Sequence, residues 1–260
     1  MIRVAANLGF LFTDLPWPDR PVAARDAGFA EVELAWPADP GLATTAVARA
    51  GVRVALLNMP AGDLAAGERG YGNDPHRRAE WRAALDRALR LAGRLGCPTV
   101  NVLAGTWCAG VPRDAQLDCL AGNLEWAARR AGGVGVGLVV EPVNSLDIPA
   151  YLLPRTGDVV ALLDRVGAPG IGVQLDTYHC AREGDDPVGW VVRLGHRLGH
   201  VQLADHPGRH EPGTGSLPVP EILRALGETG YAGAVGLEYH PTPGSDPGAV
   251  AAAVRVLGGS

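Results

Sequence analysis

Eight short apolar runs recur along this chain of 260 residues, and their spacing limits the folds that it can adopt. Each run is rich in Val, Leu, Ile and Ala and is about as long as one buried strand of a parallel sheet. Parallel neighbours need a crossover of about a dozen or more residues, which is usually a helix. The runs occupy residues 2–8, 30–35, 52–59, 99–105, 136–143, 171–178, 200–205 and 234–240.

The segments between these runs carry helical spacing. Residues 75–93 place apolar side chains on one face and arginines on the other, and residues 113–131 repeat this pattern. Asp186 followed by Pro187 has the form of a helix N-cap with a first-turn proline. Glycines suited to the left-handed position just after a helix end the helical patterns; they are Gly28, Gly51, Gly96, Gly132, Gly167 and Gly230.

Strand, helix, glycine and strand repeat without a linker, which is typical of a (β/α)8 TIM barrel. The length would also fit two smaller domains. A doubly wound open sheet is the main alternative, but it normally has a Gly-rich turn after its first strand, where this chain has "NLGFLFTDLP". We therefore predict an α/β protein with a single TIM barrel domain over residues 1–260.

The charge and hydropathy of the chain give no sign of a nucleic acid or membrane partner. The formal net charge is −5, and no run of like charge would form a basic groove. Residues 1–17 contain one early Arg and a short apolar run that Asp14 closes, and no stretch approaches the roughly 18 apolar residues of a membrane span. We expect a cytoplasmic protein.

The basic and sulfur-containing residues exclude several chemistries. All 23 Lys or Arg positions hold Arg, and the absence of lysine excludes Schiff-base aldolase chemistry, pyridoxal phosphate anchoring and a P-loop. No C-x-x-C pair is present, so we expect neither a disulfide framework nor a thiolate metal site. We expect the four cysteines to be small residues of the core; they are Cys97, Cys108, Cys119 and Cys180.

Polar side chains stand at the C-terminal ends of the last four predicted strands. Glu141, Asp176, Gln202 and Glu238 follow one another at intervals of about one βα unit. In a barrel these ends converge on the mouth where such enzymes keep their sites. Each residue alone would more commonly cap a helix or pair with an arginine, whereas the four together indicate a site.

Three carboxylates held this close would repel one another if they were buried without a cation. A divalent ion removes the conflict, and three carboxylates with an amide oxygen suit a hard ion such as Mg²⁺ or Mn²⁺. Co²⁺ would also fit.

Further polar residues in the predicted loops are candidates for substrate binding. His179 lies just beyond Asp176 and could hydrogen-bond a substrate oxygen or orient a ligand. Arg209 stands in a Gly/Pro-rich loop where its guanidinium could clamp a carboxylate. Glu68 and Arg69 lie in a long loop after the third run that could form a lid. A solvated loop residue is the alternative for each. Tryptophans that could wall the pocket, or simply pack, are Trp17, Trp36 and Trp107.

The chain resembles the hydroxypyruvate isomerase family, within the superfamily of xylose-isomerase-like TIM barrels. The resemblance covers nearly the whole chain. Its most specific parts are the loops "AGDLAAGERG" and "PGRHEPGTG", which barrel packing does not require. Other matching segments are "AANLGFLFTDLP", "EPVNSLDIPAYLL", "QLDTYH" and "GYAGAVGLEY".

The resemblance implies a metal held by Glu141, Asp176, Gln202 and Glu238, with the two glutamates as acid and base. It implies interconversion of hydroxypyruvate and tartronate semialdehyde through a cis-enediolate, so the expected partner is a small 2-oxo acid or sugar-like substrate. A homo-oligomer is left open. Gln202 favours the hydroxypyruvate branch, because ketose epimerases carry a histidine at this place.

Other functions remain open at this stage. A 2-oxo-tetronate isomerase or a ketose 3-epimerase would use the same four ligands, and a barrel that binds a metabolite without turnover is a non-catalytic alternative. An endonuclease IV-like phosphodiesterase is disfavoured, because its multi-zinc site needs further histidines and a basic groove.

Overall fold

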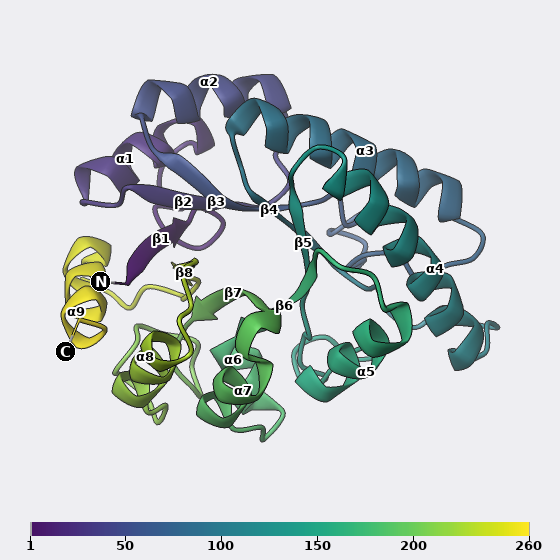
Figure 1. Ribbon diagram of the computed structural model, residues 1–260. Helices are drawn as coiled ribbons and strands as arrows, with labels where there is room; N and C mark the ends of the chain where they lie inside the picture. Colours follow the sequence, from purple (N-terminus) through teal and green to yellow (C-terminus); the bar gives the residue numbers. More distant parts are fainter. Residues whose placement is uncertain (1, 260) are drawn as a thin grey trace.

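The parallel strands close into a barrel in which each strand pairs with the next along the chain and β8 pairs with β1 (Figure 1). The computed structural model describes residues 2–259. The strands are β1 (Arg3–Asn7), β2 (Glu31–Leu34), β3 (Arg53–Asn58), β4 (Thr99–Val102), β5 (Gly137–Val140), β6 (Ile171–Asp176), β7 (Leu198–Leu203) and β8 (Ala234–Leu237). The predicted single-domain (β/α)8 TIM barrel is confirmed.

Helices form a ring around the barrel and cover the outer face of the strands (Figure 1). The connection from β6 to β7 contains two α-helices, and the last helix, α9, packs beside β1. The helices are α1 (Arg20–Asp26), α2 (Pro40–Ala50), α3 (Arg78–Leu95), α4 (Arg113–Gly132), α5 (Thr156–Val166), α6 (Thr177–Arg182), α7 (Pro187–Leu194), α8 (Val219–Glu228) and α9 (Pro247–Leu257).

Local capping explains where several of these helices begin or end. Asp186 accepts a hydrogen bond from the backbone N–H of Val188 and so caps α7 as predicted. Gly96 ends α3 in the left-handed conformation, with a φ of 62°. The prediction for Gly132 is wrong. This residue is the last of α4, and the left-handed turn falls at Gly135, because the helix runs on through the small residues.

Apolar side chains fill the space between strands and helices, whereas the inside of the barrel holds many polar ones. Trp81 of α3 is fully buried against the barrel. Three of the four cysteines are buried as predicted, and Cys108 is only half-buried. Buried polar side chains of the strands and strand ends include Asn7, Glu33, Asn101, Glu141, Gln174, Asp176, His200, Gln202 and Glu238.

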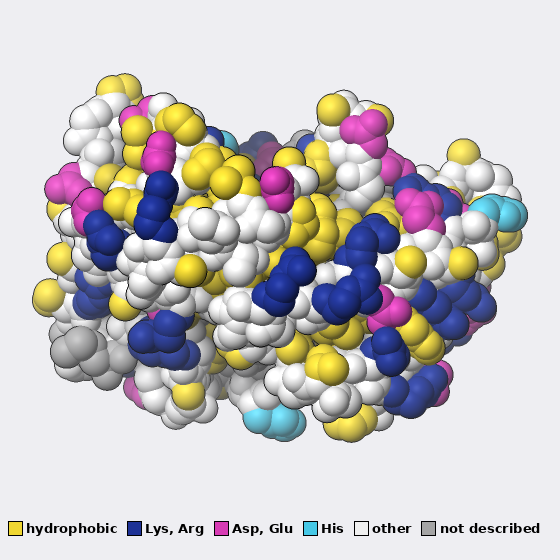
Figure 2. All heavy atoms as spheres, turned by 90° about the horizontal axis from the view of Figure 1, so that it is seen from above, with side chains coloured by type: hydrophobic (Ala, Val, Ile, Leu, Met, Phe, Trp, Pro, Cys, Tyr) yellow, Lys and Arg dark blue, Asp and Glu magenta, His cyan; other side chains and the backbone are white. Residues whose placement is uncertain are grey.

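One face of the molecule carries side chains of both charges. On the face shown in Figure 2, arginine side chains are scattered among apolar and acidic side chains. No helix within residues 2–259 is long and apolar enough to cross a membrane.

Candidate active site

The four predicted ligand residues lie on neighbouring strands at one end of the barrel. Asp176 is the last residue of β6 and pairs in register with Gln202 of β7. Glu141 and Glu238 each follow the last residue of their strands, β5 and β8. All four side chains are buried. The barrel therefore brings together residues that lie up to 97 positions apart, from 141 to 238, as the sequence predicts.

Asp176 divides its two carboxylate oxygens between structure and site. Its Oδ1 accepts hydrogen bonds from the backbone N–H groups of Tyr178 at 2.8 Å and His179 at 3.2 Å, and so caps α6. Its Oδ2 is left to face the mouth, 3.8 Å from Nε2 of His179. The cap therefore fixes the direction of Oδ2.

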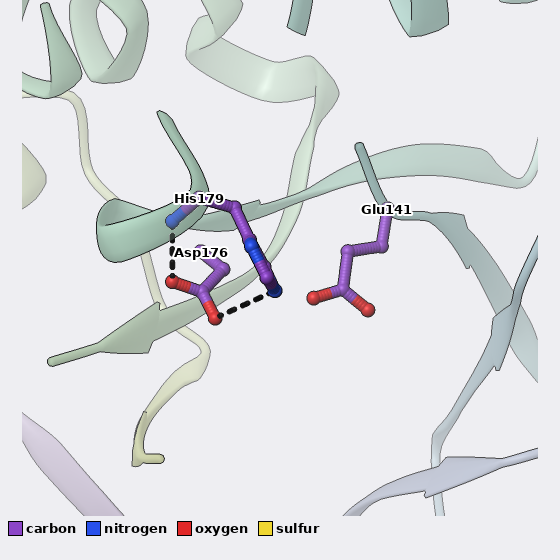
Figure 3. Close-up of side chains that lie close together, drawn as sticks. All are labelled: Glu141, Asp176 and His179. Atoms are coloured by element: carbon purple, nitrogen blue, oxygen red, sulfur yellow. Dashed lines mark hydrogen bonds and ion pairs between the residues drawn. The ribbon is translucent and has the colours of Figure 1, made fainter. Parts of the chain in front are cut away.

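Glu141, Asp176 and His179 form a tight group in which one oxygen or nitrogen atom from each lies within 4.8 Å of the others (Figure 3). The carboxylate of Glu141 points toward the edge of the His179 ring, and Asp176 lies on the other side of that edge (Figure 3). This grouping includes His179, which the sequence analysis did not count among the four predicted ligands.

Asn144 determines which nitrogen of His179 carries a proton. The Oδ1 of Asn144 accepts from the backbone N–H groups of Leu146 and Asp147, so its amide nitrogen faces Nδ1 of His179, at 2.6 Å. Burial lowers the pKa of His179 to about 4, so the neutral ring accepts at Nδ1 and bears its hydrogen on Nε2. His179 therefore presents a donor to the mouth, which suits a substrate oxygen rather than a cation.

Arg209 lies among the carboxylates of Glu141, Asp176 and Glu238 and is mostly buried. Its Nη2 donates to Oδ2 of Asp176 at 2.8 Å and to Oε1 of Glu238 at 2.5 Å. Its guanidinium also lies over the rings of Phe10 and Tyr178, 4.7 and 5.1 Å from their centroids. The sequence placed Arg209 in the mouth, but its pairing with two of the predicted ligands arises from the folded loop.

The second oxygen of Glu238 is held by two amide groups. Its Oε2 accepts from Nδ2 of Asn7 at 2.5 Å and from Nε2 of Gln202 at 2.6 Å. The Oε1 of Gln202 accepts from Gln174 at 2.7 Å. Gln202 therefore turns its amide nitrogen, not its oxygen, toward Glu238, and its oxygen keeps one further lone pair.

Burial and mutual repulsion make the two glutamates hard to ionise. Burial, followed by the charge of Asp176, raises the pKa of Glu141 to about 8, although Asn101 donates to its Oε2 at 2.8 Å. Burial also raises the pKa of Glu238 well above its ordinary value, against the opposing effect of Arg209. Both carboxyl groups can thus hold a proton near neutral pH.

These residues fit a divalent cation. Three buried carboxylates face one guanidinium, so the charge of the group remains negative when all are ionised. A positively charged group, the guanidinium of Arg209, already lies between the carboxylates of Asp176 and Glu238. Oxygen donors without a thiolate are the ligands that hard ions prefer.

Glu68 and Arg69 are directed into their own loop. Glu68 pairs with Arg77 and accepts from the backbone N–H of Asp63. Arg69 donates to the backbone oxygens of Leu64 and Glu68. Neither side chain therefore contacts Glu141, Asp176 or Glu238 in the structure, and their role in substrate binding stays a prediction.

The three tryptophans differ in their surroundings. Trp36 and Leu64 line a cavity of about 390 Å³ beside the ends of β3 and β4. Trp107 is exposed at the rim, and Trp17 is partly buried against the core.

The buried polar residues of the first half of the barrel were not predicted from the sequence. Asn7 and Asn101 hold the two glutamates, and Glu33 of β2 contacts both Asn7 and Gln202. An available signal was the pair of acids in "EVEL", because a carboxylate inside an otherwise apolar buried strand needs a partner.

Comparison with known proteins agrees with this architecture. Residues 3–258 match the family described as xylose isomerase-like TIM barrel. The chain belongs to this family. The match spans nearly the whole barrel, so the family likeness covers both the strand ends of the site and the helices outside it.

Relatives and a solved structure place the chain within the family. A 2-oxo-tetronate isomerase of Cupriavidus necator is 37% identical over 95% of this chain and 96% of its own length. The hydroxypyruvate isomerase of Escherichia coli is 34% identical over 95% of this chain and 97% of its own. A crystal structure of an AP endonuclease, family 2, from Brucella melitensis superposes with a TM-score of 0.92 at 34% identity, covering 98% of this chain and 99% of that one. This member of the xylose isomerase-like family is an enzyme of the aldose–ketose isomerase type.

Proposed function

We propose that this enzyme interconverts hydroxypyruvate and tartronate semialdehyde (2-hydroxy-3-oxopropanoate) with the help of a divalent metal ion. The observation that carries the proposal is the pair of buried glutamates, Glu141 and Glu238, on either side of Asp176 and Arg209. The name of the Escherichia coli relative supports the substrate. The four ligands would be Glu141, Asp176, Gln202 and Glu238, and Mg²⁺ or Mn²⁺ suits this oxygen-rich set.

The two glutamates would move the proton. One carboxylate removes a proton from the hydroxymethyl carbon (C3) beside the carbonyl of hydroxypyruvate, which yields a cis-enediolate. The hydroxyl proton then passes from the C3 oxygen to the C2 oxygen, and the other glutamate returns a proton to C2, so that C3 becomes the aldehyde carbon. Without a cation both carboxyl groups have a raised pKa, and a bound cation would favour the ionised form that accepts a proton. When bound, a divalent cation would polarise the carbonyl and stabilise the negative charge of the enediolate.

His179 and Arg209 would orient the substrate. The Nε2–H of His179 is a neutral donor that can reach a substrate oxygen without adding charge. Arg209 would hold the substrate carboxylate through its fork of N–H donors. To bind the substrate carboxylate, Nη2 of Arg209 must weaken or break its hydrogen bonds to Asp176 and Glu238. The negative charge of these two carboxylates would then be compensated by a bound cation.

The test is turnover of hydroxypyruvate by the purified protein before and after chelation. We expect loss of activity in EDTA and recovery on addition of Mg²⁺ or Mn²⁺, measured by the appearance of tartronate semialdehyde. Equal rates in the stripped and reloaded protein would refute the metal dependence, and absence of turnover in both would refute the substrate.

A 2-oxo-tetronate isomerase is the second candidate, and the relative from Cupriavidus necator favours it. The longer substrate needs room for one more hydroxylated carbon, which the cavity beside Trp36 could supply. Comparing kcat/KM for hydroxypyruvate with that for 2-oxo-tetronates decides between the two. Ketoses belong in the same panel, because structures of ketose epimerases share the fold at low identity.

A further inference from the structure

Another buried acid, Glu33 of β2, lies inside the barrel beside Asn7 and Gln202. Its side chain is 1% exposed. Its Oε1 accepts from Nε2 of His200, and its Oε2 accepts from Asn7 at 3.0 Å and from Gln202 at 2.7 Å. A carboxylate with this burial needs all of these donors, so the fold is built around it.

The two amides that bind Glu33 are the same two that bind Glu238. Each amide nitrogen has two hydrogens, and in both Asn7 and Gln202 one hydrogen goes to Glu33 Oε2 and the other to Glu238 Oε2. The two nitrogens and two oxygens form a closed ring of four hydrogen bonds. Glu33 and Glu238 are therefore coupled through two shared donors.

The orientation of both amides follows from their other partners. The Oδ1 of Asn7 accepts from the backbone N–H of Gly9 at 2.9 Å, and the Oε1 of Gln202 accepts from Gln174 at 2.7 Å. Both amide oxygens thus accept from other donors, which leaves the two nitrogens to face Glu33 and Glu238. Without the charge of Glu33, one hydrogen on each amide would lose its acceptor, and rotation of the amides would become easier.

Gly236 of β8 leaves the space that Glu33 occupies. A Cβ atom at this position would lie 1.7 Å from Oε1 of Glu33, so no other residue fits without displacing the carboxylate. Gly236 is also the register partner of Gln202. The strand β8, which Glu238 follows, thus has a residue without a side chain where the carboxylate of Glu33 packs against it.

We propose that Glu33 is a positioning residue, which fixes Asn7 and Gln202 so that Glu238 is held by Oε2 and presents Oε1 alone for proton transfer. The assignment rests on the proposed function for the role of Glu238 in the reaction. The Oε1 atom is the one that faces Arg209 and the mouth. The side chain of Glu33 is almost fully buried, and in this proposal it acts on Glu238 through the two amides.

Variants at position 33 test the proposal in the full-length enzyme loaded with Mn²⁺. Glu33→Leu removes both acceptors, whereas Glu33→Gln can keep an oxygen toward the amides and donate its nitrogen to His200. Glu31→Leu is the matched control, because Glu31 is also a buried acid of β2 but pairs with Arg3 and Arg53 at the other end of the barrel.

We expect Glu33→Leu to lower kcat by about 10- to 100-fold with KM changed less than about threefold, as for other residues that orient a reactive group from behind. Glu33→Gln should restore most of the rate, and Glu31→Leu should keep it. A kcat of Glu33→Leu equal to that of Glu31→Leu, or a change in KM alone, would overturn the proposal. If Glu33→Leu does not fold, Gly236→Ala displaces the same carboxylate and should show the same split between kcat and KM.

Hydrogen exchange of the side-chain amides gives a readout without turnover. The chain has six Asn and three Gln residues, so their NMR signals can be assigned from single substitutions. In the unsubstituted protein the NH₂ groups of Asn7 and Gln202 should be strongly protected, and Glu33→Leu should speed their exchange at least about tenfold. Unchanged protection contradicts the proposal. Absence of turnover by the unsubstituted enzyme would refute the proposed function, whereas the exchange rates would still decide whether Glu33 holds the two amides.

Discussion

At the scale of single residues, several polar side chains of the site have one atom held by the surrounding fold and a second atom that faces the mouth. Asp176 caps α6 with Oδ1 and faces the mouth with Oδ2. His179 accepts at Nδ1 and keeps its hydrogen on Nε2. Glu238 is held by two amides at Oε2 and meets Arg209 at Oε1. Such commitment removes rotamer freedom before a substrate arrives.

The first prediction concerns the two glutamates as acid and base. Glu141→Gln and Glu238→Gln keep the shape of the side chain and remove the proton-accepting group, so each should lower kcat by about 10²- to 10⁴-fold. Steady-state rates on hydroxypyruvate measure the effect, with circular dichroism as the check on folding. Near-normal kcat in both variants would remove the acid and base roles.

The second prediction follows from the raised carboxyl pKa values. The pKa of Glu141 rises from its ordinary value of 4.5 to about 8 in the folded chain, and the pKa of Glu238 is also raised. Between these values the folded state binds more protons than the unfolded state, so the metal-free protein should lose stability as the pH rises from about 5 to 8. Thermal unfolding in EDTA across this range measures the slope. Glu141→Gln should flatten it, and an equal slope in that variant would be the contrary result.

At the scale of elements, helix ends and helix interiors use glycine differently, and α3 contains both cases. Gly93 lies inside the helix with open space around its Cα, whereas Gly96 follows the helix with a φ of 62°. The same substitution therefore has opposite consequences three residues apart. An added methyl group reduces the freedom of the unfolded chain at both positions, but only the second position strains the folded backbone.

The third prediction is a change of sign between these two glycines. Gly93→Ala should raise the free energy of unfolding by about 0.5–1 kcal/mol, because alanine is the better helix residue. Gly96→Ala should lower it by about 1 kcal/mol, because a Cβ disfavours the left-handed conformation. Urea unfolding measures both, and kcat should stay unchanged because α3 lies outside the barrel. Equal signs would contradict the assigned helix end.

At the scale of the whole molecule, closure of the barrel joins residues from the two ends of the chain. Pairing of β1 with β8 places Asn7 beside Glu238, 231 positions away, and Glu33 beside Gln202, 169 positions away. The resulting interior is rich in carboxylates, which repel one another unless protons, Arg209 or a cation compensate them. Stability of the closed barrel is therefore linked to occupation of the site.

The fourth prediction is that linkage. If the site binds Mg²⁺ or Mn²⁺ only in the folded state, a free ion concentration of about 100 times its Kd should stabilise the protein by about 2.7 kcal/mol. Thermal or urea unfolding against ion concentration measures it at pH 7. Asp176→Ala removes a predicted ligand and should abolish the shift; an undiminished shift would place the ion elsewhere.

The order of strands and helices, and the four polar strand ends, could be predicted because both depend on local patterns. Buried parallel strands are apolar, crossover helices are amphipathic, and the C-terminal ends of barrel strands meet at one mouth. The length and spacing of these patterns are visible in a single sequence. The error at Gly132 shows the limit of such patterns, since several nearby glycines can end the same helix.

Only the tertiary structure shows how Asn7 and Glu33 support Glu238, how Arg209 pairs with Asp176, and which nitrogen of His179 carries the proton. These features depend on distances between side chains from strands and loops that are remote in the sequence, and on burial that changes their pKa values. Local patterns determine which elements form. The closure of the barrel determines which polar atoms meet, because a hydrogen bond is specific to about half an ångström and no sequence spacing carries that precision.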